Sequence, residues 1–454
     1  MARIGMDPKS WVENLFDTFD FIDLSSQEII AGIGRIKSGE FVFYTHNLKF
    51  EQGFISSRGA SEILRVMELA QTKKIPIIAL MASPGVSVKE GIKSGHEYTK
   101  VIAKNIELSG YIPQIALIIG TTMGAPAYSA TLMDFVIMNK ARSTLMVTGP
   151  GVIEKVIGQK TNMKDLGGAE IHAKKTGISD RVEANIGEQI NSAKKLLEYL
   201  PSWNEGKVAV TKSIAPKSEI QLPTSPRQAY NMFNFINGLV DGDTFLEVKP
   251  EFARSVITGF ARIEGRTIGI VANQSTHLAG ALDYESARKA ARFIRILDSF
   301  NIPLLNLIDV PGFMPGEDQE HHGLLRYGAQ MCQSMQTTTA RWSVVVRRCY
   351  GAAAFLMMQT KAQGGDYVMA LKDSSIAIMG YAGAKTMLYE NDGVDRSQEY
   401  FQQYEDPRIA KELGVVDEVI EASAVRAKIV ELFDKSLTKK YGLKNVSKKQ
   451  ISLP

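Results

Sequence analysis

The chain has 454 residues, of which 44% are hydrophobic and 22% are charged, as expected of a globular protein with about two or three domains. Its 53 basic and 49 acidic residues give a net charge of +4, which is too balanced to indicate a nucleic-acid-binding protein. The two cysteines, Cys332 and Cys349, exclude a disulfide framework and a four-cysteine zinc site, and they fit a reducing compartment. Since the N-terminus lacks the apolar core of a signal peptide and every apolar run is too short to span a bilayer, we expect a cytoplasmic protein without a transmembrane segment.

The first half of the chain alternates strand and helix patterns. A β-rich hairpin containing FVFYTH (41–46) is followed by a helix at 61–72, whose apolar residues recur at helical spacing. The Lys-Ile-Pro step at 74–76 ends this helix, because a residue before proline avoids helical backbone. It leads into a buried strand at 77–81. A Pro-Gly loop, a second helix, a buried strand at 115–119, a Gly-Ala turn and an Ala-rich helix complete the series.

The second half shows the same order of elements. Its hairpin strand, helix and two buried strands are predicted at 267–272, 285–300, 304–308 and 343–346, and the last strand again runs into a Gly-Ala turn. Strands that alternate with helices imply a mostly parallel sheet with helices packed outside it. Ligands of such folds bind at the carboxyl ends of the strands, where both the Pro-Gly loops and the Gly-Ala turns are expected.

Five landmarks recur at one fixed separation. GIGRI begins at position 32 and its counterpart GFARI at position 259. The same separation relates KIP to NIP, SPG to VPG, MGAPA to YGAAA, and Gly53 to Gly280. This regularity indicates a tandem duplication. A group of prolines between residues 201 and 226 marks the join, so we expect an N-terminal domain over 1–205, a linker over 206–227 and a C-terminal domain over 228–454.

The Gly-Ala turns carry the main indication of chemistry. A small residue after a buried strand lets a ligand approach main-chain N–H groups, and the following helix start adds its positive dipole end. Two N–H groups aimed at one oxygen would form an oxyanion hole, suited to a thioester carbonyl that becomes an enolate. The alternative is that Gly124 and Gly351 only permit close packing of helix on strand. Occurrence of the turn at identical places in both halves favours the functional interpretation.

Four longer stretches are NIPLLNLIDVPGFMPGEDQEHHGLLRYGAQM (301–331), GFARIEGRTIGIVANQ (259–274), LGGAEIHAKKTGISDRV (166–182) and GDYVMALKDSSIAIMG (365–380). They resemble the β-type carboxyltransferase subunits of biotin-dependent acyl-CoA carboxylases and decarboxylases, such as the propionyl-CoA carboxylase β subunit. The resemblance covers roughly residues 30–430 and implies an α/β fold made of two crotonase-like (ClpP/crotonase) ββα-spiral domains. It also implies assembly into dimers or hexamers in which the N-terminal domain of one subunit faces the C-terminal domain of another.

By this resemblance, the site residues can be assigned position by position. Gly124 and Ala125 match the pair of amides that holds the enolate of the acyl thioester, and Ala352 and Ala353 match the pair that holds the ureido oxygen of biotin. Residues expected to line the substrate pockets are Ser83 and Gly85 in the first half, and Pro311, Gly312, Phe313, Gly351 and Phe355 in the second.

The resemblance further implies that biotin is the cofactor and a coenzyme A thioester the substrate. Neither half contains a Met-Lys-Met type attachment motif, so biotin is expected on a partner, a biotin carboxyl carrier protein, with biotin carboxylase as a possible further partner. No side-chain base and no metal are expected in this chain, because the α-proton passes to biotin. The direction, carboxylation or decarboxylation, stays open.

The loop after the strand at 304–308 reads VPGFMPGEDQEHHG, with three acidic residues and two histidines. Adjacent histidines do not share one face of a helix, so we do not predict a metal site from His321 and His322. The acidic residues suit the first turn of one helix running to residue 331. We expect this loop to shape the biotin-side pocket, with His322 in place of the family's usual glycine. His172, beside a Gly-Gly turn, is expected to make structural hydrogen bonds, while Asp283, Asp309 and Asp366 are expected to serve turns and subunit contacts.

Departures from the family pattern lie mainly on the thioester side. The usual DSGGAR is ASPGVS at 82–87, without either charge, and the family's basic N-terminal segment is not found ahead of the first repeat. These changes suggest an acyl donor or acceptor that depends less on the coenzyme A nucleotide, such as an acyl carrier protein thioester. Two other functions remain open: a biotin-independent crotonase-type decarboxylase of a malonyl-like thioester, and a non-catalytic scaffold subunit.

Overall fold

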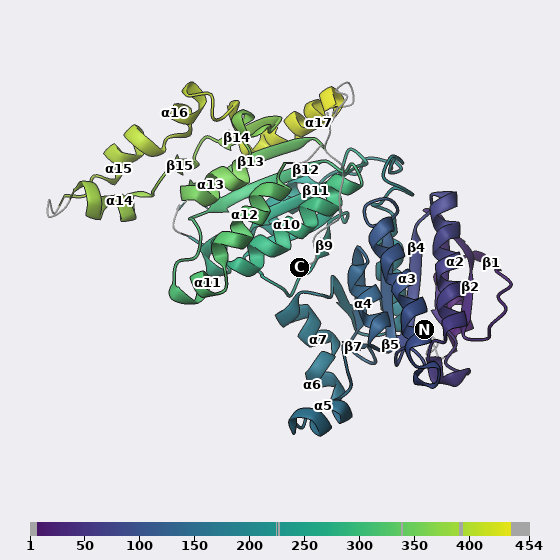
Figure 1. Cartoon of the computed structure of the whole chain (residues 1–454). Helices are drawn as coiled ribbons and strands as arrows, with labels where there is room; N and C mark the ends of the chain where they lie inside the picture. The colour runs from purple at the N-terminus through teal and green to yellow at the C-terminus, as the bar shows by residue number, and fades with distance from the viewer. Residues whose placement is uncertain (1–6, 224, 226–227, 337–338, 390–393, 437–454) are drawn as a thin grey trace. The chain divides into compact units, whose positions relative to one another are not determined.

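The computed structural model describes residues 7–223, 225, 228–336, 339–389 and 394–436. They form two compact units, divided between Ala209 and Val210, and each unit is built around an eight-stranded sheet with flanking helices (Figure 1). The domain limits of 1–205 and 228–454, with a linker between them, stay a prediction.

The sheet of the N-terminal unit has the order β1-β2-β3-β4-β5-β6-β8, and β7 pairs with β5. The β1–β2 and β2–β3 pairs are antiparallel, and the later pairs are parallel. The strands are β1 (Thr18–Phe21), β2 (Ile29–Ile36), β3 (Gly39–His46), β4 (Ile77–Ser83), β5 (Gln114–Met123), β6 (Phe135–Asn139), β7 (Thr144–Met146) and β8 (Arg181–Glu183). The helices are α1 (Pro8–Leu15), α2 (Ser57–Lys73), α3 (Ile92–Leu108), α4 (Ala125–Leu132), α5 (Pro150–Ile157), α6 (Met163–Gly167), α7 (Ala169–Ile171) and α8 (Ile186–Leu197).

The sheet of the C-terminal unit has the order β16-β14-β13-β12-β11-β10-β9, and β15 pairs with β13. Here β9–β10 and β10–β11 are antiparallel and the other pairs are parallel. The strands are β9 (Leu246–Val248), β10 (Val256–Ile263), β11 (Arg266–Asn273), β12 (Leu304–Val310), β13 (Arg341–Tyr350), β14 (Tyr367–Leu371), β15 (Ser375–Ala377) and β16 (Glu418–Ile420). The helices are α9 (Phe233–Leu239), α10 (Tyr284–Ser299), α11 (Glu317–His321), α12 (Leu324–Ser334), α13 (Gly351–Met358), α14 (Tyr381–Leu388), α15 (Ser397–Tyr400), α16 (Pro407–Glu412) and α17 (Val425–Ser436).

The strand pairings confirm the predicted tandem duplication. Each sheet has a register shift at the same place, between Met81 and Ser83 of β4 and between Ile308 and Val310 of β12. An isolated parallel bridge also recurs, as Ile55 with Val86 and as Leu282 with Phe313. These pairs keep the constant separation found in the sequence, so the two units share backbone geometry as well as motifs.

The predicted helix ends before the Ile-Pro steps are confirmed, although the first helix starts earlier than expected. The side chain of Ser56 caps α2 by accepting a hydrogen bond from the N–H of Gly59. Asp283 caps α10 in the same way. Beyond the two helices, Lys74 and Asn301 adopt left-handed backbone with φ of 56° and 54°, which stops each helix and turns the chain into the Ile-Pro step.

The strands that follow, β4 and β12, are buried along their whole length. Such continuous apolar burial is typical of parallel strands that are covered on both faces. The Pro-Gly loops leave these strands at their carboxyl ends, and the Gly-Ala turns leave the neighbouring strands β5 and β13 at the same edge. The fold thus brings together the two loops of each half on which the chemical interpretation depends.

One predicted element differs in the structure. The single helix expected through residue 331 is divided into α11 and α12, with a break at His322 and Gly323. Gly323 has a φ of +81°, a left-handed value that a glycine adopts without strain and that interrupts the helical path. The three acidic residues therefore lie in the short helix α11 and not in the first turn of the longer one. None of the helices that the structure describes is long and apolar enough to cross a membrane.

Candidate functional site

The Gly-Ala turn of the N-terminal unit presents one unpaired N–H group. Gly124, between β5 and α4, has a φ of +65° and donates its N–H to the carbonyls of Met146 and Val147, both at 3.2 Å. Pro126 has no N–H to donate. Ala125, the first residue of α4, has no acceptor for its N–H within the described part of the chain, as expected at a helix start. The prediction that Gly124 and Ala125 act as a pair stays a prediction, but only the Ala125 N–H is available here.

The Pro-Gly loop after β4 lies against this turn. A Cβ atom built on Gly124 would lie 4.0 Å from the Cα of Gly85. Ser83 shapes the loop from within, since its buried hydroxyl donates to the carbonyl of Gly53 at 2.7 Å and accepts from the N–H of Gly85 at 3.2 Å. Two predicted site residues, Ser83 and Gly85, are thus placed directly beside the Gly-Ala turn.

Val86 supplies a second available N–H group. Its neighbours pair with Ile55, because Ile55 donates to the Gly85 carbonyl and Ser87 donates to the Ile55 carbonyl. In such a bridge the intervening N–H points away from the partner, and among the described residues the Val86 N–H has no acceptor. Sequence reasoning did not single out Val86. The signal was present, however, because the duplication makes Val86 the counterpart of Phe313, which was predicted.

The C-terminal unit repeats the loop bridge and the helix start of this arrangement with different side chains. Leu282 donates to the carbonyl of Gly312 and accepts from Met314, which leaves the N–H of Phe313 without an acceptor in the described part of the chain. Gly351, with a φ of +67°, begins α13, and the N–H groups of Ala352 and Ala353 lie in its first turn, where the helix supplies no acceptor. Ala352 is the counterpart of Ala125, and Ala353 that of Pro126.

A buried ion-pair network distinguishes the two units beneath these turns. Asp309, at the end of β12, is fully buried and accepts hydrogen bonds from Arg347 at 2.8 Å and from Arg348 at 2.7 Å. Asp309 therefore serves this network and not a turn, and its expected role in subunit contacts stays a prediction. The equivalent positions of the N-terminal unit are Ala82, Gly120 and Thr121, so no such network can form there.

Asp283 serves the turn into α10, as expected, whereas Asp366 links two segments that are distant in the sequence. Asp283 caps α10 through the N–H of Ser286 at 2.7 Å, and Asp366 accepts from the N–H of Arg341 at 2.9 Å.

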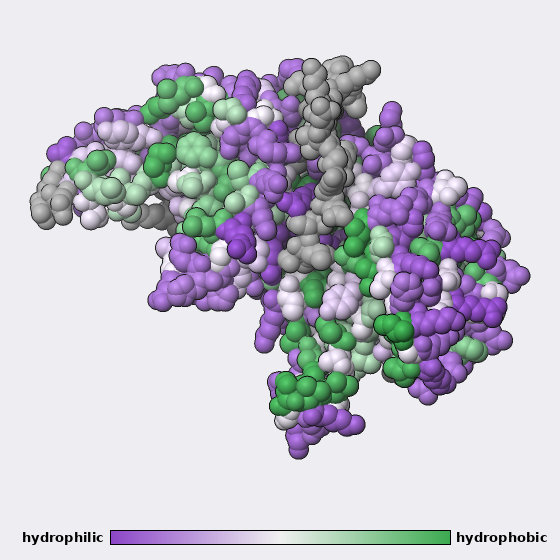
Figure 2. All heavy atoms as spheres, in the orientation of Figure 1, coloured by the Kyte–Doolittle hydropathy of each residue, from purple (hydrophilic) through white to green (hydrophobic). Residues whose placement is uncertain are grey.

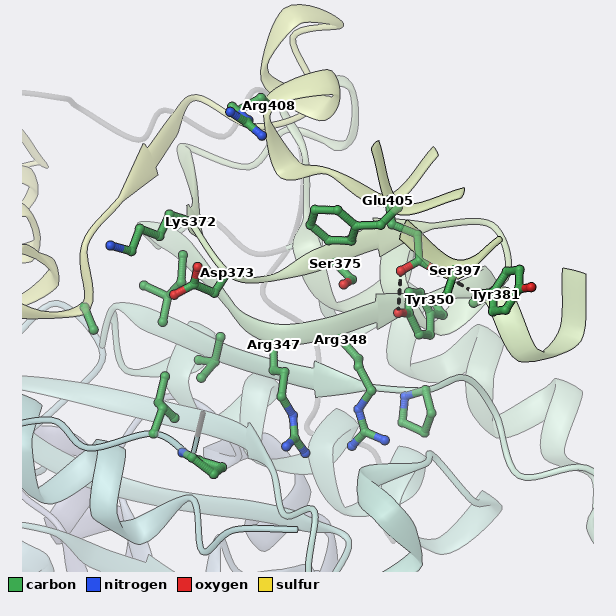
Figure 3. Close-up of a pocket in the computed structure, with 18 of the residues that line it drawn as sticks. Arg347, Arg348, Tyr350, Lys372, Asp373, Ser375, Tyr381, Ser397, Glu405 and Arg408 are labelled. Atoms are coloured by element: carbon green, nitrogen blue, oxygen red, sulfur yellow. Dashed lines mark hydrogen bonds between the residues drawn. The ribbon is translucent and has the colours of Figure 1, made fainter. Parts of the chain in front are cut away.

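A pocket of about 1270 Å³ lies within the C-terminal unit, beside the end of β13 (Figure 3). Arg347, Arg348 and Pro311 line it, and Tyr350 donates to Glu405 across it at 3.2 Å. Burial and the neighbouring Glu405 raise the pKa of Tyr350, so its hydroxyl stays protonated and can donate. Of the predicted site residues, only Pro311 is in the pocket lining; Gly312, Phe313, Gly351 and Phe355 are not.

His172 makes two hydrogen bonds, as predicted. Its Nε2 donates to the carbonyl of Leu145 at 2.7 Å, and Nδ1 then accepts from the hydroxyl of Thr176 at 2.9 Å. Burial lowers the pKa of His172, which favours this neutral tautomer. These two hydrogen bonds link β7 to the segment that follows α7.

His321 and His322 are exposed and lie near acidic residues of their own helix. His322 stacks on Tyr284 with a centroid distance of 4.9 Å, and its Nδ1 lies 3.2 Å from a carboxylate oxygen of Asp318. Within the described ranges, no group of three or more His, Cys, Asp or Glu side chains is arranged to hold a metal ion.

Each unit carries an exposed apolar surface next to its Gly-Ala turn. The exposed residues occupy equivalent positions, because β7 pairs with β5 as β15 pairs with β13. Figure 2 shows hydrophobic residues gathered over the projecting helix α5. The equivalent exposed pairs are Tyr128 and Phe355, Val147 and Ile378, Val156 and Met387, and Ile157 and Leu388.

Comparison with known proteins agrees with this geometry. The family model described as carboxyl transferase domain matches residues 9–451. The propionyl-CoA carboxylase beta chain of Roseobacter denitrificans is 34% identical over 449 residues, which cover 94% of this chain and 88% of that protein. The methylmalonyl-CoA decarboxylase subunit alpha of Propionigenium modestum is 33% identical over 429 residues, covering 91% and 83% of the two chains.

A solved structure shares the whole fold. Transcarboxylase 12S, crystallised as a hexamer with methylmalonyl-coenzyme A bound, superimposes with a TM-score of 0.91 at 32% identity, covering 98% of this chain and 92% of that one. The predicted α/β fold of two crotonase-like domains is thereby confirmed. The chain belongs to the carboxyl transferase domain family, that of the β-type subunits of biotin-dependent acyl-CoA carboxylases and decarboxylases, and it is a carboxyltransferase enzyme.

Proposed function

We propose that this chain moves a carboxyl group between biotin, carried by a partner protein, and the α-carbon of an acyl thioester. The observation that carries the proposal is the presence of two equivalent pairs of main-chain N–H groups, Val86 with Ala125 and Phe313 with Ala352, for which the described residues supply no acceptor. Each pair joins a Pro-Gly loop to a helix start, so the helix dipole adds to its attraction for a negative oxygen.

The N-terminal pair is suited to the thioester. A thioester carbonyl held by the N–H groups of Val86 and Ala125 would gain stabilisation as it becomes an enolate, because N–H donors already in place need no rearrangement. Gly85 and Gly124 have no side chains at this point, so the carbonyl can approach the main chain closely.

The C-terminal pair is suited to the ureido oxygen of biotin, which is an acceptor of the same kind. Biotin would bring the carboxyl group and accept the α-proton, so no side-chain base of this chain is required. The residues of this chain would hold both oxygens and keep the reacting carbons together. Beneath this pair, Asp309 pairs with both Arg347 and Arg348, so the network keeps one positive charge in excess, which suits a ligand oxygen that gains negative charge.

Assembly is part of the proposal. The equivalent exposed surfaces around the two turns would bury apolar side chains if the N-terminal unit of one copy met the C-terminal unit of another. We therefore expect a dimer or a hexamer, with a biotin carboxyl carrier protein as partner and biotin carboxylase as a further one. Multi-angle light scattering should find no active monomer at assay concentration; an active monomer would remove this part of the proposal.

Proline substitutions test the N–H groups, since these residues have no functional side chains. Ala125→Pro and Ala352→Pro each delete one proposed donor, and loss of one oxyanion donor typically lowers a rate by about 10²–10³-fold. Ala353→Pro is the matched control for backbone strain, because Pro126 already occupies the equivalent position. Carboxyl transfer from a panel of 2-carboxyacyl thioesters to biotin would be followed, with circular dichroism and oligomer size as folding checks.

The three variants separate the possible outcomes. If Ala352 pairs with Phe313, Ala353→Pro keeps most of the activity; if Ala352 pairs with Ala353, as the sequence suggested, this variant loses it. Near-normal turnover of both folded Ala125→Pro and Ala352→Pro would show that the N–H pairs are not used. Turnover by the wild-type protein without biotin would instead favour the biotin-independent decarboxylase.

A further inference from the structure

An apolar hollow of about 290 Å³ opens beside the N-terminal Gly-Ala turn. It is bounded by the first turns of α4, by the end of β7 and by the segment after α7. Two of its residues, Met146 and Val147, are the ones whose carbonyls accept the N–H of Gly124. The hollow therefore touches the turn that holds the proposed thioester donor. Its other lining residues include Ala127, Tyr128, Thr131 and Ile178.

Two polar side chains at the hollow, those of His172 and Thr131, are already hydrogen-bonded, and the rest of the lining is mainly apolar. The Nε2–H of His172 is bound to the carbonyl of Leu145, and the hydroxyl of Thr131 donates to the carbonyl of Tyr128 at 2.9 Å. A ligand in this hollow would thus gain contacts with hydrocarbon rather than hydrogen bonds. That chemistry suits an aliphatic chain.

The size of the hollow exceeds what a short acyl group needs. Its volume corresponds to that of about ten molecules of liquid water. The tail of a propionyl group has only two carbons beyond the carbonyl. Since α4 rises about 1.5 Å per residue, Tyr128 lies within about one helical turn of the Ala125 N–H, so a chain attached to the bound carbonyl can reach the hollow.

Comparison with the C-terminal unit identifies the residue that keeps the hollow open. The counterpart of Thr131 is Met358, whose side chain is fully buried, whereas Thr131 is only partly buried and lines the hollow. The counterparts of Ala127 and Tyr128 are Ala354 and Phe355, of similar size. Of these three positions on α4, Thr131 is the one whose side chain is smaller than its counterpart.

We propose that the hollow binds the acyl chain of the thioester substrate, and that Thr131 sets the chain length that this enzyme accepts. The inference rests on the proposed function for the position of the carbonyl and extends it to the substrate class, acyl thioesters longer than propionyl. Each methylene buried in an apolar site typically tightens binding about fourfold.

Binding of unreactive ligands tests the inference without requiring turnover. Alkyl thioethers of coenzyme A with ethyl, butyl and octyl chains lack the carbonyl, so their affinity does not depend on the N–H pair. Isothermal titration calorimetry of the wild-type protein should show at least tenfold tighter binding of the octyl than of the ethyl ligand. Thr131→Met, which copies Met358, should reduce this gain to less than threefold and leave ethyl binding unchanged.

Two further variants guard against misfolding. Thr131→Ser keeps the hydroxyl and the space, and it should retain the chain-length gain. Thr131→Glu places a charge at a partly exposed position, and it should abolish the gain even if methionine is not accommodated. Affinity that is independent of chain length in the wild-type protein would overturn the inference. An equal effect of Thr131→Met on all three ligands, or a change in its oligomer size, would overturn it too, since the hollow would then belong to a subunit contact.

The outcomes also distinguish this inference from the proposed function. Tight octyl binding together with no carboxyl transfer to biotin from any thioester would refute the function but keep the acyl-chain site. Transfer to biotin from short thioesters, with no effect of chain length on binding, would keep the proposed function and refute the acyl-chain site.

Discussion

A buried histidine of the N-terminal unit should make its stability depend on pH in the weakly acidic range. His46, the last residue of β3, is fully buried; its Nδ1 accepts a long hydrogen bond of 3.3 Å from the N–H of Ala82, and its Nε2 has no hydrogen-bond partner within the described ranges. Burial lowers the pKa of His46 from 6.5 to about 4. The folded state therefore excludes a proton that the unfolded chain accepts.

The sign and size of the effect follow from this difference. Below pH 6.5 the unfolded chain binds a proton at His46 and the folded chain does not, so the free energy of unfolding falls as the pH falls, until the folded form also protonates near pH 4. A difference of 6.5 − 4 = 2.5 pKa units corresponds to about 3 kcal/mol over the whole range. Between pH 7 and pH 4.5, about 2.5 kcal/mol of this should be lost.

The duplication supplies the substitution that tests the effect. The counterpart of His46 is Asn273, which accepts from the N–H of Asp309 and donates to the carbonyl of Gly280 at 3.0 Å. His46→Asn should keep the bond to Ala82 and remove the titrating group. Hydrogen exchange of the β3 and β4 amides, measured by mass spectrometry at pH 7 and pH 4.5, gives the local free energy of opening for both proteins.

The decisive quantity is the difference between the variant and the wild-type protein at the two pH values. Other titrating groups contribute equally to both proteins and cancel. When the pH is lowered from 7 to 4.5, the free energy of opening should fall by about 2.5 kcal/mol less in His46→Asn than in the wild-type protein. This holds whatever the stability of the variant at pH 7. A difference that is the same at both pH values would refute the argument, because His46 would then not be the excluded base.

Two other predictions concern the asymmetry between the units. Asp309→Asn should destabilise the C-terminal unit by about 3–5 kcal/mol in urea unfolding, because the buried Arg347 and the partly buried Arg348 keep their charges and lose their carboxylate. A loss of stability below about 1 kcal/mol would contradict this argument. Because ASPGVS at 82–87 carries no charge, this enzyme should depend less on the coenzyme A nucleotide. The ratio of its activity with short pantetheine or carrier-protein thioesters to its activity with coenzyme A thioesters should exceed the same ratio for a relative that has Asp and Arg there. An equal ratio in both enzymes would contradict this prediction.

The fold was largely accessible from the sequence because its signals are local. The Ile-Pro steps, the Pro-Gly loops and the Gly-Ala turns each constrain a few consecutive residues, and their repetition at one separation fixed the order of the elements. The break at His322 and Gly323 is local too, but glycine is compatible with both a helix and a left-handed turn. The sequence alone could not decide between these two conformations.

The site was accessible only in part, because the availability of an N–H group is a tertiary property. The pair Gly124 and Ala125 looks equivalent in sequence, yet the arrival of β7 occupies the N–H of Gly124 and leaves that of Ala125 free. Val86 was missed for the same reason. Its N–H lacks an acceptor because its two neighbours bond to Ile55, and Ile55 lies far from Val86 in the chain, before both α2 and β4. Hydrogen-bond partners that lie far apart along the chain leave no recognisable pattern in the amino-acid sequence.

Apart from the additional N–H of Ala353, the two units present equivalent main-chain donors, so the remaining difference between the two sites comes from side chains. Beneath the C-terminal pair, Asp309 holds two arginines in place, whereas beneath the N-terminal pair Ala82 and Gly120 leave no room for them: a Cβ on Gly120 would lie 3.1 Å from that of Ala82. An uncharged floor and an apolar hollow favour an acyl chain, whereas arginines favour a polar ligand such as the ureido group. Under the proposed function, the duplication would keep the chemistry that both substrates need, an oxygen held by two N–H groups, and would assign recognition to the few side chains in which the copies differ.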